Sequence, residues 1–490
     1  MVIKFDILNH ADFCGEFRGD KYIPGLRKFH NAIETVREKN PDNTLLLDAG
    51  DEINRLLWHG RDVIDGMELI GTDAWTLGNH EFDRGRESLE ENVEYIHKKI
   101  PVLCANIRNK NNGEPVKNTV PYVILERSGV KIGIIGVTTE YTEKMVTYPF
   151  FEPFETSSAA DAVHRCFREV KEKGAQIIIV LAHIGAYSND GIYGGELFEL
   201  LENIRDLDID LLIGGHTPGD ICQTFDGIMV NKGGFSGKSL LHTTLYFDTE
   251  QNKVIKAEGE ILYPLEEKYD VPCQKIDEFT EKVLKPFDLY FNDVFAVATE
   301  DVNMNYGRES AMGDLFADAV RWKTGTDFSY FNTTSCGPRI PEGNITRYSI
   351  KQAIYFDEHI HIAKFTGHQI RKLFETVHNP DIYSKNFNLY FSGLKVTIDH
   401  DREYGHKVVS IKHFDGRDVR EDEVLSVATS AYMASGGNDT RKIAGEVNWK
   451  ETDIFIHDAI KDYLTEKKSI DNSIDNRYVF LGRAVEYDDH

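Results

Sequence analysis

The sequence lacks the marks of a small disulfide-stabilised protein and of a membrane-spanning one. Its six cysteines are scattered over 490 residues, and no two of them have the CxxC spacing of zinc ribbons and dithiol redox motifs. So few cysteines in so long a chain do not predict a disulfide framework. No apolar run approaches the roughly 20 residues that a membrane-spanning helix needs. These absences favour a globular protein with an apolar core, in keeping with its hydrophobic content of 41%.

The N-terminus also lacks the pattern of a secretion signal. Residues 1–8 (MVIKFDIL) resemble a first strand, without a charged region followed by a long apolar one. We therefore predict a cytoplasmic protein. A secreted protein is the alternative, if a signal has been removed from the chain.

Positive charge is in short supply. The chain has 56 Lys and Arg against 81 Asp and Glu, and its formal net charge is −25. This excess of negative charge predicts that neither a nucleic-acid polymer nor an anionic membrane is a partner. An anionic substrate would need a local positive charge, and a bound metal ion is the simplest source of one.

The length predicts two domains. In the first half, short apolar runs alternate with stretches of helical spacing, which is typical of a layered α/β domain. The predicted strands are 3–8, 44–48, 73–77, 102–105, 122–126, 130–137, 176–182 and 209–213. The predicted helices are 25–39, 63–70, 87–99, 159–173 and 196–204. Three further stretches, 221–230, 240–247 and 254–262, are β-rich.

The pattern changes near residues 266–296. Apolar residues within Ile276–Leu284 have helical spacing, and Pro272 and Pro286 flank this segment. We predict a connector helix within 266–296, between a first domain at 1–265 and a second α/β domain at 297–490.

Metal-capable side chains recur where the predicted strands end. Gly78–Asp83 (GNHEFD) is the densest example, with an amide, an imidazole and two carboxylates behind a glycine that permits close backbone approach. The same kinds of side chain follow four other predicted strands, namely Asp12, Cys14, Asp51, His183 and His216.

These side chains are predicted to meet, because the carboxyl ends of parallel strands share one edge of a sheet. Their mix of oxygen and nitrogen ligands suits Zn, Mn or Fe. Any one of them alone is more often a helix cap or a hydrogen-bonded structural residue. Their repetition at five strand ends favours a single metal site.

The ordered motifs resemble those of the 5′-nucleotidase family of calcineurin-like metallophosphoesterases, whose signature includes GNHEFD. The first-half motifs are Asp12-x-Cys14-Gly15, Gly50-Asp51, Gly78–Asp83, Ala182-His183 and Gly214-Gly215-His216. In the second half, segments 308–318, 337–339, 364–367, 391–393 and 435–439 follow the order of the family's C-terminal domain. The resemblance implies an α/β protein with a four-layer α/β/β/α metallophosphoesterase sandwich at 1–265. It also implies a connector helix at 266–296 and a smaller α/β substrate-binding C-terminal domain at 297–490.

The resemblance also implies roles for individual residues. Two divalent ions, of Zn, Mn or Fe, would be held by Asp12, Cys14, Asp51, Asn79, His183 and His216. His80, oriented by Asp83, would act on the leaving group. The substrate would be bound by Arg339, Phe391, Gly436, Gly437, Asn438 and Asp439. For Arg339, a surface ion pair is the alternative.

Three positions depart from the family pattern. Cys14 stands where the family has His, and Pro218 stands where it has His or Gln, so one metal site lacks two usual ligands. A thiolate binds Zn or Fe, whereas proline has no donor, which leaves this site ligated by Cys14, weak or empty. His10 would substitute only if the first strand continues to it. Thr440 replaces a base-stacking ring, a change that would weaken nucleoside selectivity by roughly 1–3 kcal/mol.

The sequence thus predicts metal-dependent hydrolysis of a phosphate ester by an activated water. The substrate would be a nucleotide or a related small phosphorylated metabolite, as in nucleotide catabolism. A phosphodiesterase or nucleotide-sugar hydrolase on the same scaffold is one alternative. A degenerate member that binds its ligand without turnover is another.

Overall fold

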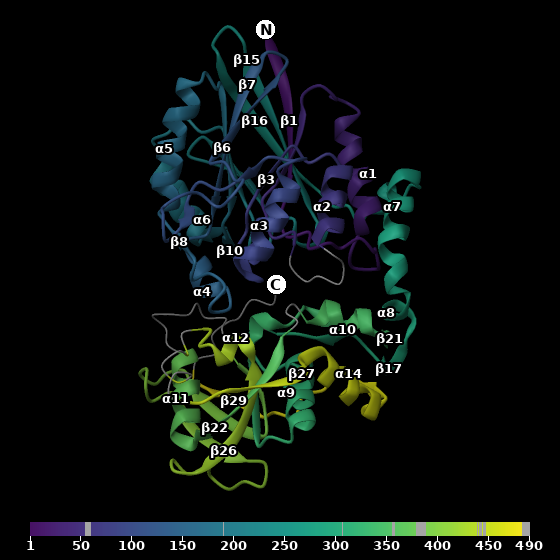
Figure 1. The fold of residues 1–490 in the computed structure, drawn as a ribbon, viewed down its shortest axis with the longest axis vertical. Helices are drawn as coiled ribbons and strands as arrows, with labels where there is room; N and C mark the ends of the chain where they lie inside the picture. Colours follow the sequence, from purple (N-terminus) through teal and green to yellow (C-terminus); the bar gives the residue numbers. More distant parts are fainter. Residues whose placement is uncertain are drawn as a thin grey trace. The chain divides into compact units, whose positions relative to one another are not determined.

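The computed structural model describes residues 1–53, 60–189, 191–305, 307–354, 358–378, 389–438, 440, 443 and 447–482. The chain divides into two compact units, Met1–Pro286 and Phe287–His490 (Figure 1). The predicted connector, 266–296, lies across this division, and the domain boundaries at 265 and 297 stay predictions. Its helix is confirmed, because α7 covers Gln274–Leu284 and packs against α1 (Gly25–Arg37) of the first unit.

Two six-stranded sheets form the centre of the first unit. Their orders are β16-β15-β1-β2-β3-β4 and β13-β14-β12-β9-β7-β6. The first sheet contains β1 Val2–His10, β2 Thr44–Asp48, β3 Ala74–Thr76, β4 Val102–Leu103, β15 Leu240–Asp248 and β16 Lys253–Leu262. The second contains β6 Tyr122–Arg127, β7 Val130–Thr138, β9 Ile177–His183, β12 Leu211–Gly214, β13 Ile221–Phe225 and β14 Ile228–Lys232. Four neighbouring strands run parallel in each sheet, so that their carboxyl ends share an edge. They are β1, β2, β3 and β4 in the first sheet and β14, β12, β9 and β7 in the second.

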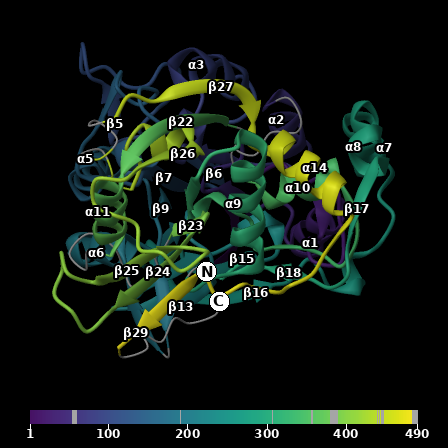
Figure 2. The same ribbon diagram turned by 90° about the horizontal axis from the view of Figure 1, so that it is seen from below.

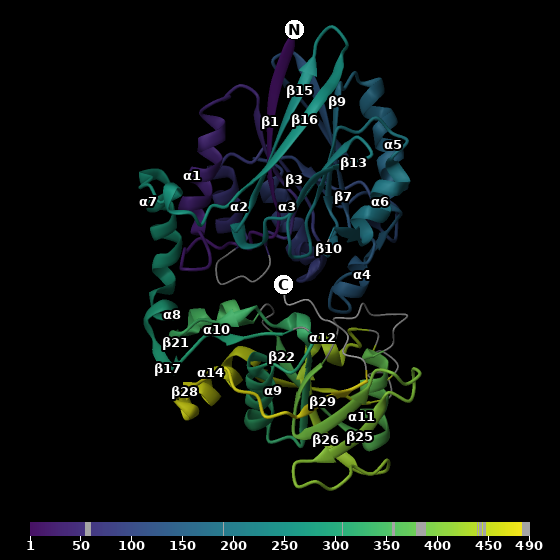
Figure 3. The same ribbon diagram turned by 180° about the vertical axis from the view of Figure 1, so that it is seen from behind.

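The two sheets face each other, and helices cover their outer faces. Along β7, Ile132 and Ile134 pack into the core between the sheets, whereas Ile135 and Val137 pack against the helices outside. The helix layers are α1, α2 (Gly60–Leu69) and α3 (Gly85–Ile96) on one side, and α5 (Ala159–Glu172) and α6 (Glu196–Ile204) on the other (Figures 1 and 3). This arrangement confirms the predicted α/β/β/α sandwich.

The strands and helices predicted for the first half are present, with ends that differ by a few residues. Short elements were not predicted, because they carry too few residues to show a period. They are β5 (Ile107–Asn109), β8 (Phe154–Thr156), β10 (Tyr187–Asn189), β11 (Ile192–Gly194) and α4 (Thr142–Met145). None of the helices in the described part of the chain is long and apolar enough to cross a membrane.

The second unit is built on a five-stranded sheet with the order β23-β19-β26-β22-β27. The strands are β19 Phe328–Asn332, β22 His359–Thr366, β23 Leu389–Ser392, β26 Val424–Ser430 and β27 Lys450–Phe455. Helices α9 (Ala311–Thr324) and α14 (Ile456–Lys467) cover one face, and α11 (Gly367–Val377) covers the other (Figure 2). The predicted second α/β domain is confirmed as an α/β unit.

Candidate active site

The predicted metal ligands of the first unit lie at the carboxyl ends of strands from both sheets. Asp12 follows β1, Asp51 follows β2 and Asn79 follows β3, all from the first sheet. The second sheet contributes His183, the last residue of β9, and His216, just after β12. The site therefore lies where the edges of the two sheets meet.

The backbone at these positions adopts a conformation that side chains other than glycine rarely take. The φ angles are +54° at Asp12, +59° at Cys14, +61° at Asp51 and +70° at His216. A left-handed backbone costs a non-glycine residue on the order of 1–3 kcal/mol, and such strain persists mainly at functional sites. Four predicted ligands thus occupy turns whose strain the rest of the fold must offset.

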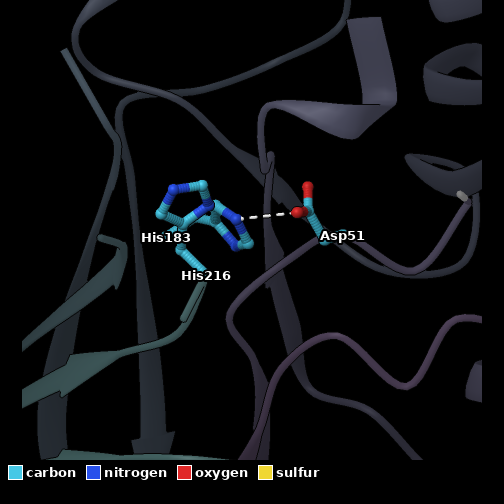
Figure 4. Close-up of side chains that lie close together, drawn as sticks. All are labelled: Asp51, His183 and His216. Atoms are coloured by element: carbon cyan, nitrogen blue, oxygen red, sulfur yellow. Dashed lines mark ion pairs between the residues drawn. The ribbon is translucent and has the colours of Figure 1, made fainter. Parts of the chain in front are cut away.

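Asp51 is the centre of the site (Figure 4). Its Oδ2 lies 3.0 Å from Nε2 of His183 and 3.9 Å from Nε2 of His80, and its Oδ1 accepts the backbone N–H of His80 at 2.9 Å. Ligand atoms of Asp51, His183 and His216 all lie within 4.8 Å of one another. The three side chains are therefore close enough to bind one ion.

Two glycines allow the Asp51 loop to approach the loop after β3. A Cβ at Gly78 would lie 2.0 Å from Oδ1 of Asp51, and a Cβ at Gly50 would lie 2.6 Å from the nitrogen of Gly78. Gly50 also has a φ of +92°. Any other residue at either position would displace the carboxylate.

Glu81 holds the same loop in place. Its carboxylate accepts backbone N–H groups from Gly78 at 2.6 Å, Glu52 at 2.9 Å, Asp51 at 3.1 Å and Ile53 at 3.3 Å. Burial raises the pKa of Glu81, and the nearby Asp51 carboxylate raises it further. Glu81, a residue of the GNHEFD motif, thus fixes the position of Asp51.

Several buried polar atoms around Asp51 lack a hydrogen-bond partner among the described residues. They are both amide atoms of Asn79 and Nδ1 of His216. Nδ1 of His183 donates to the carbonyl oxygen of Ala49 at 2.6 Å, which leaves Nε2, facing Oδ2 of Asp51, as the ligand atom of this ring. Unsatisfied buried atoms are costly, and a divalent cation would satisfy this set at once. The residues present therefore fit a metal ion.

The electrostatics of the cluster favour a positive charge at its centre. Burial alone raises the pKa of Asp51, but His183 and His80 outweigh it and hold the pKa well below its usual range. Burial lowers the pKa of His183, but Asp51 outweighs it and raises the pKa to about 10. Burial and the neighbouring His183 lower the pKa of His216 to about 3, so its ring is neutral and free to act as a ligand.

His80 and Asp83 form a second pair beside Asp51. Nδ1 of His80 lies 2.7 Å from Oδ2 of Asp83. Burial lowers the pKa of His80, but the carboxylates of Asp83 and Asp51 outweigh it and raise the pKa to about 9. His80 can therefore hold a proton at neutral pH, with Asp83 setting its orientation.

The other predicted ligands, Asp12 and Cys14, already have hydrogen-bond partners. Asp12 Oδ2 accepts the backbone N–H of His216 at 3.0 Å, and the Cys14 thiol donates to the carbonyl oxygens of Asp12 at 3.1 Å and Asp51 at 3.5 Å. Within the described ranges, neither Asp12 nor Cys14 belongs to a group of three close metal-ligating side chains.

The loop that carries Pro218 is held by a buried lysine. The Lys232 ammonium donates to the carbonyl oxygens of Pro218 and Gly219, and its side chain is fully buried. Burial lowers the pKa of Lys232 to about 8, although Asp12 and Asp220 act in the opposite direction. The Lys232 ammonium thus contacts the loop in which the family pattern places another metal ligand.

The predicted substrate-binding residues lie in the second unit, with Arg339 in β20 (Arg339–Ile340). One of its guanidinium nitrogens is 3.5 Å from Oδ2 of Asp301, the ion pair expected as the alternative. The ring of Phe391 is 1% exposed and packs edge-on against Phe374 and Tyr478 at 5.1 and 5.0 Å. This burial argues against a direct substrate contact by Phe391.

The glycine-rich loop after β26 is tightly packed. Gly436 has a φ of +94°, and a Cβ at Gly437 would lie 2.4 Å from the ring of Tyr432. Asn438 has a φ of +53°, and its Oδ1 is buried without a partner in the described part of the chain. Asp439 lies outside the described residues. The substrate contacts of this loop stay predictions.

Comparisons with known proteins agree with this geometry. A family model described as "Calcineurin-like phosphoesterase" matches residues 10–220, and one described as "5'-nucleotidase, C-terminal domain" matches residues 293–444. The chain is 22% identical to the "5'-nucleotidase" of Vibrio vulnificus over 96% of this chain and 91% of that protein. It is 27% identical to "Endonuclease YhcR" of Bacillus subtilis over 82% of this chain, but spans only 34% of that longer protein.

A solved structure supports the same fold. The crystal structure of a 5′-nucleotidase precursor from Thermus thermophilus has a TM-score of 0.84 and 21% identity, covering 98% of this chain and 100% of that one. The matched family models fall on the two units in the predicted order. The chain therefore belongs to the 5′-nucleotidase family of calcineurin-like metallophosphoesterases, which are metal-dependent hydrolases of phosphate esters.

Proposed function

We propose that this protein removes the phosphate of a nucleotide at the cluster of Asp51, Asn79, His183 and His216. The observation that carries the proposal is the set of unpaired, buried ligand atoms around Asp51. A divalent ion bound there would supply positive charge to the phosphate and lower the pKa of a water molecule near it. The relatives named 5′-nucleotidase support a nucleotide as the substrate.

The chain's own residues would position and protonate the reacting groups. Asp51 presents Oδ2 to the centre because its Oδ1 is occupied by the backbone N–H of His80. His80 would donate its proton to the leaving oxygen, since Asp83 holds the other ring nitrogen at 2.7 Å. Water would reach the site from the side of His80, whose side chain is 20% exposed whereas that of His183 is fully buried.

The metal content is proposed in two parts. The side of Asn79, His183 and His216 would bind one ion of Zn, Mn or Fe tightly, because imidazole and oxygen ligands suit these metals. The side of Asp12 and Cys14 would bind a second ion weakly, because its thiol donates to backbone carbonyls and Pro218 offers no donor. The cytoplasmic location stays a prediction, since the structurally similar Thermus protein is described as a precursor.

Phosphodiester cleavage is the second candidate. It is favoured by the similarity to a protein named an endonuclease, although the chain spans about a third of it. The two functions are separated by measuring phosphate release from AMP and cleavage of bis(p-nitrophenyl) phosphate by the same preparation. The proposal expects AMP to be the better substrate in kcat/KM. Faster diester cleavage would replace the first candidate by the second.

A His80→Asn variant tests the assignment of the site itself. It should lose roughly 10²-fold or more of kcat, the usual contribution of a general acid, while keeping its metal content. His164→Asn, on the outer helix α5, is the matched control and should keep full activity. If His80→Asn keeps full activity on AMP, the assigned centre is wrong.

A further inference from the structure

A second group of buried metal-ligating side chains lies beside the active site. It consists of His10, Asp48 and Glu52, and one ligand atom of each lies within 4.8 Å of the others. All three side chains are fully buried. They differ from the residues assigned above to metal binding and hydrolysis.

Strand pairing creates this cluster. His10 ends β1 and Asp48 ends β2, and the two residues are direct neighbours in the parallel pairing of these strands. Glu52 follows in the loop after β2, and its Oε1 accepts the backbone N–H of Phe13 at 3.0 Å. The consecutive residues Asp51 and Glu52 thus belong to different clusters, Asp51 with His183 and Glu52 with His10.

The polar atoms of the cluster are not satisfied within the described part of the chain. Both ring nitrogens of His10, Oδ2 of Asp48 and Oε2 of Glu52 are buried without a hydrogen-bond partner. Nδ1 of His10 lies 3.4 Å from Oε1 of Glu52. The other oxygen of Asp48 accepts the backbone N–H of Gly50 at 2.9 Å, which fixes the carboxylate. Each unsatisfied buried group destabilises the fold unless it finds a partner.

Aromatic rings line one side of the cluster. The His10 ring packs edge-on against Phe29 at 5.1 Å and against Phe13 at 6.4 Å. Two carboxylates in such an apolar setting repel each other and lose their hydration, so they need a positive charge between them. A divalent cation matches two carboxylates and one neutral imidazole in charge and in ligand type.

We propose that His10, Asp48 and Glu52 bind a divalent transition-metal ion of the Mn-to-Zn series, separate from the hydrolytic centre. The imidazole favours these metals over Mg²⁺ and Ca²⁺, which prefer oxygen ligands alone. The ion ties the ends of β1 and β2 to the loop that carries Asp51. Its role is structural, because the site is fully buried and offers no room for a substrate.

Metal content tests the proposal without reference to activity. The parent protein is the full chain with His183→Asn and His216→Asn, which removes ligands of the hydrolytic centre. After loading with Zn²⁺ or Mn²⁺ and removal of free ions, this parent should retain about one equivalent. Adding His10→Asn or Glu52→Gln should remove that equivalent. Asp210→Asn, which alters a buried carboxylate that accepts the N–H of Ile178 at 2.8 Å, is the control and should leave the metal in place.

Thermal unfolding gives the second readout. A chelator should lower the Tm of the parent, but should have no further effect once Glu52→Gln is present. Equal metal content in the parent and in both cluster variants would overturn the proposal, because the three residues would then be a neutral, proton-sharing cluster.

If the variants do not fold, crystals of the unaltered chain test whether His10 binds a metal ion. An anomalous difference peak about 2.0–2.1 Å from a ring nitrogen of His10 is expected after loading with Zn²⁺. A fully loaded crystal without that peak would overturn the proposal, whatever the occupancy of the hydrolytic centre.

Discussion

The two sides of Asp51 offer a comparison within one site. On the side of Asn79 and His216, buried ligand atoms lack partners among the described residues, and a divalent cation would satisfy them. On the side of Cys14 and Pro218, the thiol donates to backbone carbonyls and the loop is held by the ammonium of Lys232. A family motif can therefore keep its position in the fold while its polar atoms take other partners.

Removing a ligand on either side should have very different effects. His216→Asn should lower kcat/KM for a nucleotide by roughly 10³-fold or more, because a metal ion contributes several kcal/mol to catalysis. Cys14→Ser keeps a donor for the same carbonyls and should change the rate less than about tenfold, or about 1.4 kcal/mol. Phosphate release by the two variants, assayed together, checks this. Equal losses would mean that both sides bind catalytic ions.

The proton donor should be less important for a substrate with a good leaving group. His80→Asn should lose roughly 10²-fold on AMP but much less on p-nitrophenyl phosphate, whose leaving oxygen hardly needs a proton. The unaltered enzyme should also lose activity as the pH rises and His80 is deprotonated, and the variant should lack this decline. The same loss on both substrates would assign His80 to ground-state binding instead.

Restoring the ligands of the family pattern should strengthen metal binding at the site of Asp12 and Cys14. A double variant, Cys14→His with Pro218→His, should retain up to one more equivalent of metal than the unaltered chain, because two imidazoles would join Asp12. Elemental analysis after desalting measures the gain. An unchanged metal content would show that Lys232, or the path of its loop, rather than the missing ligands, keeps the ion out.

Glu81 should support the Asp51 loop in the absence of any metal. Glu81→Gln should lower the free energy of unfolding by about 1–3 kcal/mol, because the amide group replaces one acceptor oxygen of a carboxylate that receives four backbone N–H groups. Urea unfolding of chelated protein is the measurement, with the exposed Glu155→Gln as control. Equal stability of the two variants would show that the Glu81 carboxylate does not stabilise the Asp51 loop.

The partly buried pair of Asp6 and His242 provides a reference that no metal should affect. Asp6 accepts from His242 at 2.8 Å and from Thr244 at 2.7 Å, far from the strand ends that carry the active site. Burial raises the pKa of Asp6, but these hydrogen bonds outweigh it and lower the pKa to about 2. Burial lowers the pKa of His242, but Asp6 and Glu260 outweigh it and raise the pKa.

The pH dependence of this pair follows from the two shifts. The Asp6 contribution is present above its unfolded pKa near 4 and is lost as the pH falls towards 2. The His242 contribution is present below pH 6.5 and is lost as the pH rises through its raised pKa. Asp6→Asn should therefore cost roughly 1–2 kcal/mol near pH 5 and less at pH 3 or pH 9, with or without metal. A cost that is independent of pH would contradict these pKa directions.

Much of this architecture was predictable from periodicity. Runs such as 44–48 and 176–182 predicted strands, and the polar residues after them, Asp51 and His183, marked the active edge, because parallel strands deliver their ends to one place. The motif around Gly78–Asp83 predicted the pairing of His80 with Asp83, which the structure contains.

Other features depend on side-chain directions that spacing does not show. His10 was considered as a substitute ligand beside Asp12, but one of its ring nitrogens lies close to ligand atoms of Asp48 and Glu52 instead. Phe391 was predicted to contact substrate, yet its ring is part of the core of the second unit. Lys232 gave no signal, because a single lysine at a strand end is ordinarily solvent-exposed.

The most direct test of the hydrolytic metal centre is the metal dependence of nucleotide hydrolysis by the unaltered chain. Protein stripped with a chelator and assayed with AMP should release no phosphate, and Mn²⁺, Zn²⁺ or Fe²⁺ should restore release. Phosphate release that persists in stripped protein, or that no divalent ion restores, would contradict the assignment of Asp51, Asn79, His183 and His216 as a hydrolytic metal centre.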